Sequence, residues 1–99
     1  MRRGTTPKHT FTLPFDTSLI CKLRVIYAQS RVAKIVKKKT DAELSGNTVS
    51  VKLTQDETLR LNCRHKTEIQ VRVVTHDGES FVSDIITVNT DRCLDNEVL

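Results

Sequence analysis

The sequence is poor in aromatic residues and has no long apolar run. Its 99 residues include three Phe, one Tyr and no Trp. No apolar stretch approaches the roughly 20 residues that a membrane-spanning helix needs, and none follows Arg2 and Arg3 as it would in a secretory signal. With 37% hydrophobic and 28% charged residues, the composition is typical of one globular domain. We therefore expect no membrane contact and synthesis in a cytoplasm.

Cysteine is also scarce, and its spacing favours neither disulfides nor metal binding. Cys21, Cys63 and Cys93 are odd in number and far apart, which is a poor disulfide framework. Cys63 and His65 lie two residues apart, but no CxxC or HxxxH spacing supplies further ligands. We expect no metal and no cofactor. Cys21 falls at an apolar position of an expected strand, so we predict that it packs in the core.

Motifs that carry enzymatic chemistry are absent from the chain. It has no GxGxxG, GxxxxGK[ST], HExxH or GxSxG motif. His9, His65 and His76 fall at a strand start and in two loops, with no pattern that places them beside a nucleophile. A Cys63–His65 pair is conceivable, but neighbouring residues seldom aim at one another, and catalytic triads are assembled from distant segments. We predict that the protein is not an enzyme and has no catalytic residues.

The sequence is rich in short patterns of period two, which indicate strands with one buried face. The clearest example for a central strand covers residues 66–75, where Ile69 and Val71 share a face with Val73. Turn residues at 76–78 and a second apolar run at 81–88 then predict a β-hairpin. The same alternation predicts further strands over residues 8–15, 19–29, 31–38 and 48–53.

These elements predict an all-β domain of about seven short strands. Turn signals roughly 8–12 residues apart are typical of two-sheet sandwiches. Thr54 and Glu57 have capping-box spacing, which predicts one helical turn crossing between the sheets. We expect a flexible N-terminal arm over 1–7, a single domain over 8–90 and a C-terminal tail over 91–99. The predicted fold is an immunoglobulin-like or fibronectin-like β-sandwich, with a small β-barrel as the alternative. A true immunoglobulin domain is not expected, because Trp and the Cys…Trp…Cys spacing are missing.

Five stretches together resemble a group of small proteins of similar length that tailed bacteriophages and prophages encode among their virion genes. The stretches are HTFTLPFD (9–16), LTQDET (53–58), EIQVRV (68–73), SDIITV (83–88) and CLDNEVL (93–99). The similarity runs from Lys8 to the end, and its motifs are structural rather than catalytic. The resemblance implies a non-enzymatic structural or accessory subunit of a virion, made in the bacterial cytoplasm. It leaves open whether the subunit belongs to the tail, baseplate, neck or capsid.

Charge is unevenly distributed along the sequence. Residues 1–52 contain eleven Lys or Arg and three Asp or Glu, whereas residues 53–99 contain five and nine. One cluster predicts a basic edge strand, made of Arg31, Lys34, Lys37, Lys38 and Lys39. Edge lysines also prevent edge-to-edge aggregation, and a solvated face of mixed charge is the simplest interpretation. Phosphate contact remains open, although aromatic residues for base stacking are few.

Apolar residues outside the expected core suggest a binding surface. We expect Ile20 and Ile26 on the outer face of a sheet, where another subunit or the tail would cover them. Partners would be copies of the chain, associating head to tail, or other virion proteins. The alternatives are a phage inhibitor that blocks a host protein surface and a nucleic-acid-binding module. The candidate partner-binding residues are Ile20, Ile26, Arg31, Lys34, Lys37, Lys38, Lys39, Leu94, Val98 and Leu99.

Overall fold

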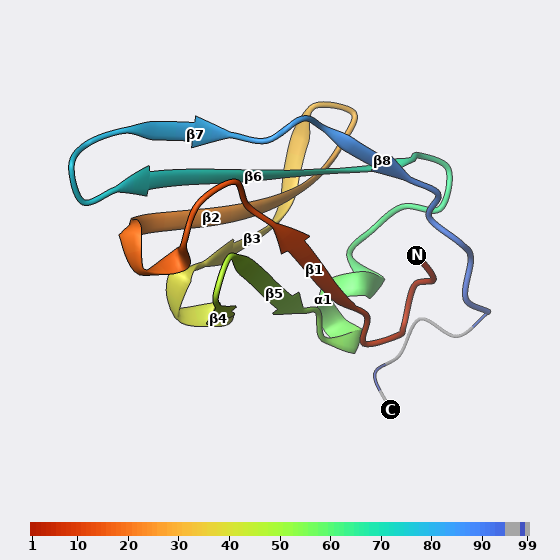
Figure 1. Cartoon of the computed structure of the whole chain (residues 1–99). Coiled ribbons are helices and arrows are strands. Elements are labelled where there is room, and N and C mark those ends of the chain that lie inside the picture. Colours follow the sequence, from red (N-terminus) through yellow and green to blue (C-terminus); the bar gives the residue numbers. More distant parts are fainter. Residues whose placement is uncertain (95–97, 99) are drawn as a thin grey trace.

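The computed structural model describes residues 1–94 and 98, and these form a sandwich of two antiparallel sheets (Figure 1). The larger sheet has the order β3-β2-β6, with β7 and β8 paired in succession along the far edge of β6. The smaller sheet has the order β1-β5-β4. The strand bounds are Lys8–Thr12 (β1), Ile20–Gln29 (β2), Val32–Lys38 (β3), Ala42–Ser45 (β4), Thr48–Lys52 (β5), Thr67–Thr75 (β6), Ser80–Val82 (β7) and Ile86–Val88 (β8). The predicted all-β sandwich is confirmed.

Three short helical segments connect the strands. η1 (Thr17–Leu19) leads into β2, and η2 (Lys39–Asp41) joins β3 to β4. α1 (Gln55–Leu59) crosses from β5 of the smaller sheet to β6 of the larger one. Its predicted capping box is present, because the Thr54 N–H donates to Glu57 Oε1 at 2.9 Å and the Glu57 N–H donates to Thr54 Oγ1 at 3.2 Å.

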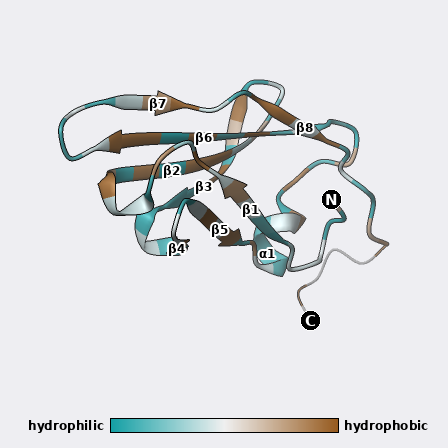
Figure 2. Cartoon of the chain, viewed as in Figure 1, coloured by the Kyte–Doolittle hydropathy of each residue, from teal (hydrophilic) through white to brown (hydrophobic). Residues whose placement is uncertain are grey.

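The core lies between the sheets and is built from side chains that alternate along the strands. Apolar segments concentrate on β2, β5 and β6 (Figure 2). In β6, the buried residues Ile69, Val71 and Val73 are those that the period-two pattern placed on one face. The other fully or almost fully buried apolar residues are Leu13, Ile20, Leu23, Val25, Tyr27, Ile35, Val49, Val51, Leu53 and Leu61. Every second residue of β6, and of β2 from Lys22 onward, therefore faces away from the smaller sheet.

A β-bulge near the start of β2 contradicts two predictions made from the sequence. Ile20 pairs with Thr75 and Lys22 pairs with Val74, so Cys21 is an extra residue in β2. The extra residue shifts the alternation by one position. As a result, Ile20 is 0% exposed and belongs to the core, whereas Cys21 is exposed. The predictions that Ile20 lies on an outer face and that Cys21 packs in the core are both wrong.

The N-terminal segment lies against the C-terminal part of the described chain. The Arg3 N–H donates to the Asp91 carbonyl at 3.0 Å, and the Asp91 N–H donates to the Met1 carbonyl at 2.7 Å. Gly4 also donates to Thr58 Oγ1 in α1 at 3.0 Å. Residues 1–4 are therefore held between α1 and the segment that follows β8. In the described part of the chain, no helix is long and apolar enough to cross a membrane.

Candidate functional site: the cationic outer face

The larger sheet presents an exposed face on the side away from the smaller sheet, which we call the outer face. Residues directly opposite one another in antiparallel strands point to the same side. The acidic residue Glu68 also lies on this face and is half-buried. It is opposite Ala28 and four positions along β6 from Arg72, so it does not lie beside Arg72. The main outward-facing residues are Lys22, Arg24, Ile26, Val36, Lys38, Arg72, Val74 and Val82.

Three cations stand in a row across this face. Arg24 of β2 pairs with Lys38 of β3 on one side and with Arg72 of β6 on the other. Adjacent strands are about 4.8 Å apart, and like charges directly opposite one another destabilise a sheet. None of the three side chains forms an ion pair with a described residue. This cation row therefore carries uncompensated repulsion, which a bound anionic group would offset.

Two shallow hollows adjoin the cation row and together form a cationic trough across the strands. The first has a volume of about 230 Å³ and is lined by Lys22, Arg24 and Arg72 together with Val74 and Ser80. The second, of about 350 Å³, is lined by Lys38 and Lys39 and shares Lys22 and Arg24 with the first. No Asp or Glu of the described residues lines either hollow. The trough is therefore suited to a negatively charged ligand.

The predicted basic edge is only partly exposed. β3 is an edge strand as expected, and Lys38 belongs to the cation row. Lys34 is the extra residue of a second bulge and is exposed, and Arg31 lies in the exposed β2–β3 turn. Lys39 lines the trough, although its ammonium group donates to the Ile20 carbonyl at 2.9 Å.

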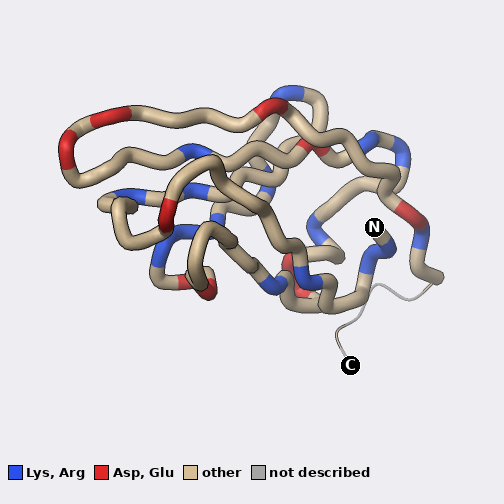
Figure 3. Tube along the Cα trace, viewed as in Figure 1, with Lys and Arg blue, Asp and Glu red and all other residues tan. Residues whose placement is uncertain are grey.

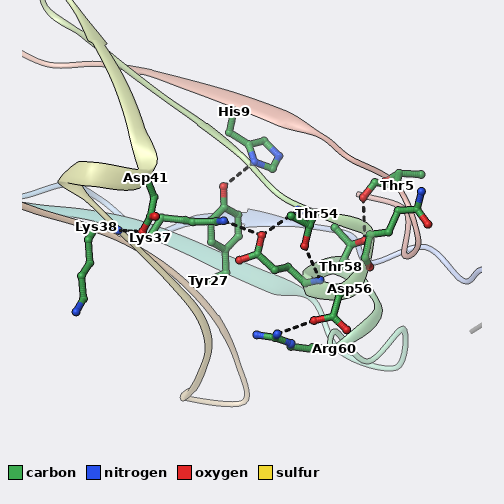
Figure 4. A network of polar contacts seen from close by, with 12 residues as sticks. Thr5, His9, Tyr27, Lys37, Lys38, Asp41, Thr54, Asp56, Thr58 and Arg60 are labelled. Carbon is green, nitrogen blue, oxygen red and sulfur yellow. Dashed lines mark hydrogen bonds and ion pairs between the residues drawn. The ribbon is translucent and has the colours of Figure 1, made fainter. Parts of the chain in front are cut away.

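Lys37 is the exception, because it points between the sheets. Its side chain is 12% exposed and its Nζ lies 2.6 Å from Glu57 Oε1 (Figure 4). Lys37 shares a face with the buried Ile35 two residues earlier. Its inclusion in an exposed basic edge is wrong.

The Lys37–Glu57 ion pair belongs to a polar network between the sheets. Burial opposes ionisation of Glu57, but the hydrogen bonds from Lys37 and Thr54 outweigh it and hold the pKa of this carboxyl below its usual value. Nearby, the Tyr27 hydroxyl lies 2.7 Å from His9 Nδ1 (Figure 4). Burial, followed by the charge of Glu57, raises the pKa of Tyr27, and burial lowers the pKa of His9. Both shifts favour the neutral forms of the two side chains, which share this hydrogen bond.

Apolar side chains border the cation row on the same outer face. Ile26 is half-buried and pairs with Val36, which is 42% exposed. Val82 pairs with Arg72 and is 49% exposed. In the tail, Leu94 is 91% exposed, and Val98 lines a separate hollow beside Lys52 and Leu53. Leu99, the last candidate residue, lies outside the described residues.

Three residues of the site were missed by the sequence analysis, namely Lys22, Arg24 and Arg72. Arg24 and Arg72 alternate with core residues of β2 and β6, so their outward direction is visible in the sequence. Their proximity is not, because it depends on the register between strands that are far apart along the chain. Residues 1–94 and 98 contain no group of three or more His, Cys, Asp or Glu that could hold a metal ion.

No protein-family model and no curated protein matches the chain. Among solved structures, the chain is similar to the V domain of amphioxus IgVJ-C2, with 10% sequence identity and a TM-score of 0.38. The alignment covers 91% of this chain and 96% of that one. At these values, the similarity carries nothing about function.

Proposed function

We propose that this chain is a non-catalytic protein-binding module that binds an acidic protein surface through its outer face. The observation that carries the proposal is the cation row, in which Arg24 stands directly between Lys38 and Arg72. Holding three like charges opposite one another costs stability. A folded domain that needed only solubility would intersperse charges of both signs. Carboxylates of a partner would offset the repulsion and fill the trough.

A protein partner is favoured over nucleic acid by the neighbours of the cation row. Protein interfaces combine arginine with apolar groups, and here Ile26, Val36 and Val82 lie beside the cations. Proteins that bind single-stranded nucleic acid instead add exposed aromatic rings for stacking. The outward-facing residues of the outer face named above include no aromatic residue. Nucleic-acid binding is therefore the second candidate, and the cation row alone supports it.

The narrower proposal is a structural or accessory subunit of a tailed-phage virion. Its support is the sequence resemblance over residues 8–99. In this setting the partners are other virion proteins or copies of the chain, and the protein is made in the bacterial cytoplasm before it joins the particle. An inhibitor of a host protein would use the same surface. A binding surface without catalytic residues serves either role.

The proposal is tested by measuring binding of two probes of equal negative charge. One is a Glu-rich peptide with interspersed leucines, and the other is an oligothymidylate. We expect the peptide to bind, and R24E/R72E to raise its Kd roughly tenfold or more, since like-charge contacts are strongly unfavourable. R64E/K66E makes the same charge change in an exposed loop away from the outer face and is expected to bind as the unaltered protein does.

Two results would overturn this proposal. If the oligothymidylate binds with a steep salt dependence and the peptide does not, the chain is a nucleic-acid-binding module. If R64E/K66E weakens peptide binding as much as R24E/R72E does, binding depends on net charge and the outer face is not the site.

A further inference from the structure

A second surface of opposite character lies at the end of the sandwich formed by the β6–β7 turn. It is a hollow of about 340 Å³, which we call the end hollow. Phe15, Leu19 and Phe81 form its apolar wall, and Asp77 and Glu79 also line it. The two Phe rings meet edge to face with their centroids 5.5 Å apart, and Leu19 is 50% exposed. No Lys or Arg of the described residues lines this hollow.

The end hollow is held in shape by hydrogen bonds. The His76 N–H donates to the Leu19 carbonyl at 3.0 Å, which ties the end of β6 to η1. Within the turn, the Thr75 N–H donates to the Glu79 carbonyl at 2.9 Å and the Thr75 hydroxyl donates to the Asp77 carboxylate. The bond from Thr75, followed by that from the Glu79 N–H, keeps the pKa of Asp77 below its usual value. The hollow therefore presents a fixed negative charge beside an exposed apolar side chain.

The end hollow and the trough adjoin the β6–β7 hairpin, and Ser80 lines both of them. Phe81 pairs with the buried Val73, so it lies on the inner side of the hairpin. Ser80 pairs with Val74, and both belong to the outer side. Figure 3 shows basic residues along β2, β3 and β6 and acidic residues at the β6–β7 turn. A single chain thus carries two surfaces of opposite charge, one on the outer face and one at the β6–β7 turn.

We propose that the outer face of one copy docks on the end hollow of a second copy. The proposal rests on the proposed function and names the acidic partner as this chain itself. Arg24, Arg72 and Lys38 then meet Asp77 and Glu79, while apolar side chains beside the cation row enter the apolar part of the hollow. Because two different surfaces of the chain meet, the contact is heterologous. Such a contact generates a ring or an open chain rather than a two-fold dimer.

The test uses charge reversal at each surface, with light scattering over a concentration series at low salt. We expect the unaltered protein to form assemblies larger than a dimer that dissociate as salt rises. E79K, with or without D77K, and R24E/R72E should each raise the dissociation constant of assembly roughly tenfold or more. E43K, a charge reversal on β4 of the smaller sheet, is the matched control and is expected to assemble as the unaltered protein does.

Mixing the two kinds of variant gives the decisive result. D77K/E79K makes the end hollow cationic and R24E/K38E/R72E makes the cation row acidic, so an equimolar mixture of these two variants should recover alternating assemblies. E79K without D77K leaves the turn hydrogen bonds of Asp77 intact and guards against loss of the turn. The proposal is overturned if the unaltered protein is a strict monomer at every concentration, or if the mixture stays monomeric. If the protein still binds the Glu-rich peptide in that case, self-association is excluded but the proposed binding of an acidic protein surface is not.

Discussion

Arg24 and Arg72 lie directly opposite each other on β2 and β6, and neither forms an ion pair with a described residue. Charges of this kind are usually staggered or neutralised across a sheet. We predict that R72E raises the free energy of unfolding by about 0.5–1 kcal/mol at low salt, because it creates an attractive pair with Arg24. Urea unfolding would measure the gain, which should shrink as salt rises. K66E serves as the control, and an equal gain there would show a general effect of net charge.

The buried Lys37–Glu57 ion pair gives a second prediction. K37A leaves the Glu57 carboxylate largely buried without its cation and should lower the free energy of unfolding by about 1–3 kcal/mol. K37M combined with E57Q removes both charges and should recover part of that loss. A K37A variant as stable as the unaltered protein would contradict a structural role for the pair.

The same pair predicts how stability depends on pH. The pKa of Glu57 is lower in the folded chain than its ordinary value of 4.5. The unfolded chain therefore binds the proton more readily, and Glu57 contributes stability at pH values above 4.5 that is lost as pH falls through the folded-state pKa. Unfolding curves between pH 3 and 7 should show a smaller acid loss in E57Q than in the unaltered protein. An identical pH dependence in both would contradict the prediction.

The two-residue turn between β2 and β3 is strained. Gln29 pairs with Val32, and the intervening Ser30 and Arg31 have φ angles of +50° and +67°. These are the signs of a type I′ turn, which favours Asn-Gly. S30N/R31G should therefore raise the free energy of unfolding by about 0.5–1.5 kcal/mol. The control is G78A, which should destabilise because Gly78 has a φ of +87°. A destabilised S30N/R31G variant would show that the native side chains hold the turn by other contacts.

Ile20 and Ile26 should respond differently to the same substitution. Ile20 is fully buried, so I20T should lower the free energy of unfolding by about 2–3 kcal/mol. Ile26 lies half-buried on the outer face, so I26T should change stability little and weaken binding of the Glu-rich peptide. Thermal unfolding and peptide titration separate the two effects. Equal destabilisation by both substitutions would place Ile26 in the core and remove it from the binding surface.

Much of the fold could be predicted because local rules governed it. Strict alternation located β6 and its buried residues, and the Thr54–Glu57 spacing located α1. The alternation failed at Cys21, where one inserted residue reversed the direction of Ile20. A bulge depends on how β2 pairs with β6, and the hydrophobic pattern of one strand does not show how it pairs with another.

The site was predicted less completely than the fold. Lys38 was predicted to belong to the basic edge because it lies in a run of lysines. The same run led to the wrong prediction for Lys37, which faces inward with Ile35. Arg24 and Arg72 are isolated in the sequence and become neighbours of Lys38 only through strand register. The end hollow likewise joins η1 to a hairpin about 60 residues later in the sequence. A surface made by residues of several strands can be predicted only when the pairing of those strands is known.

The central claim is that the cation row is the binding site, and a map of backbone amide shifts tests it most directly. The labelled protein would be titrated with the Glu-rich peptide at low salt and followed by two-dimensional nuclear magnetic resonance. We predict shift changes concentrated at Arg24, Lys38 and Arg72 and at the residues lining the trough, and their loss in R24E/R72E. Changes confined to the loop of Arg64 and Lys66, or spread evenly over all surface lysines and arginines, would contradict the account.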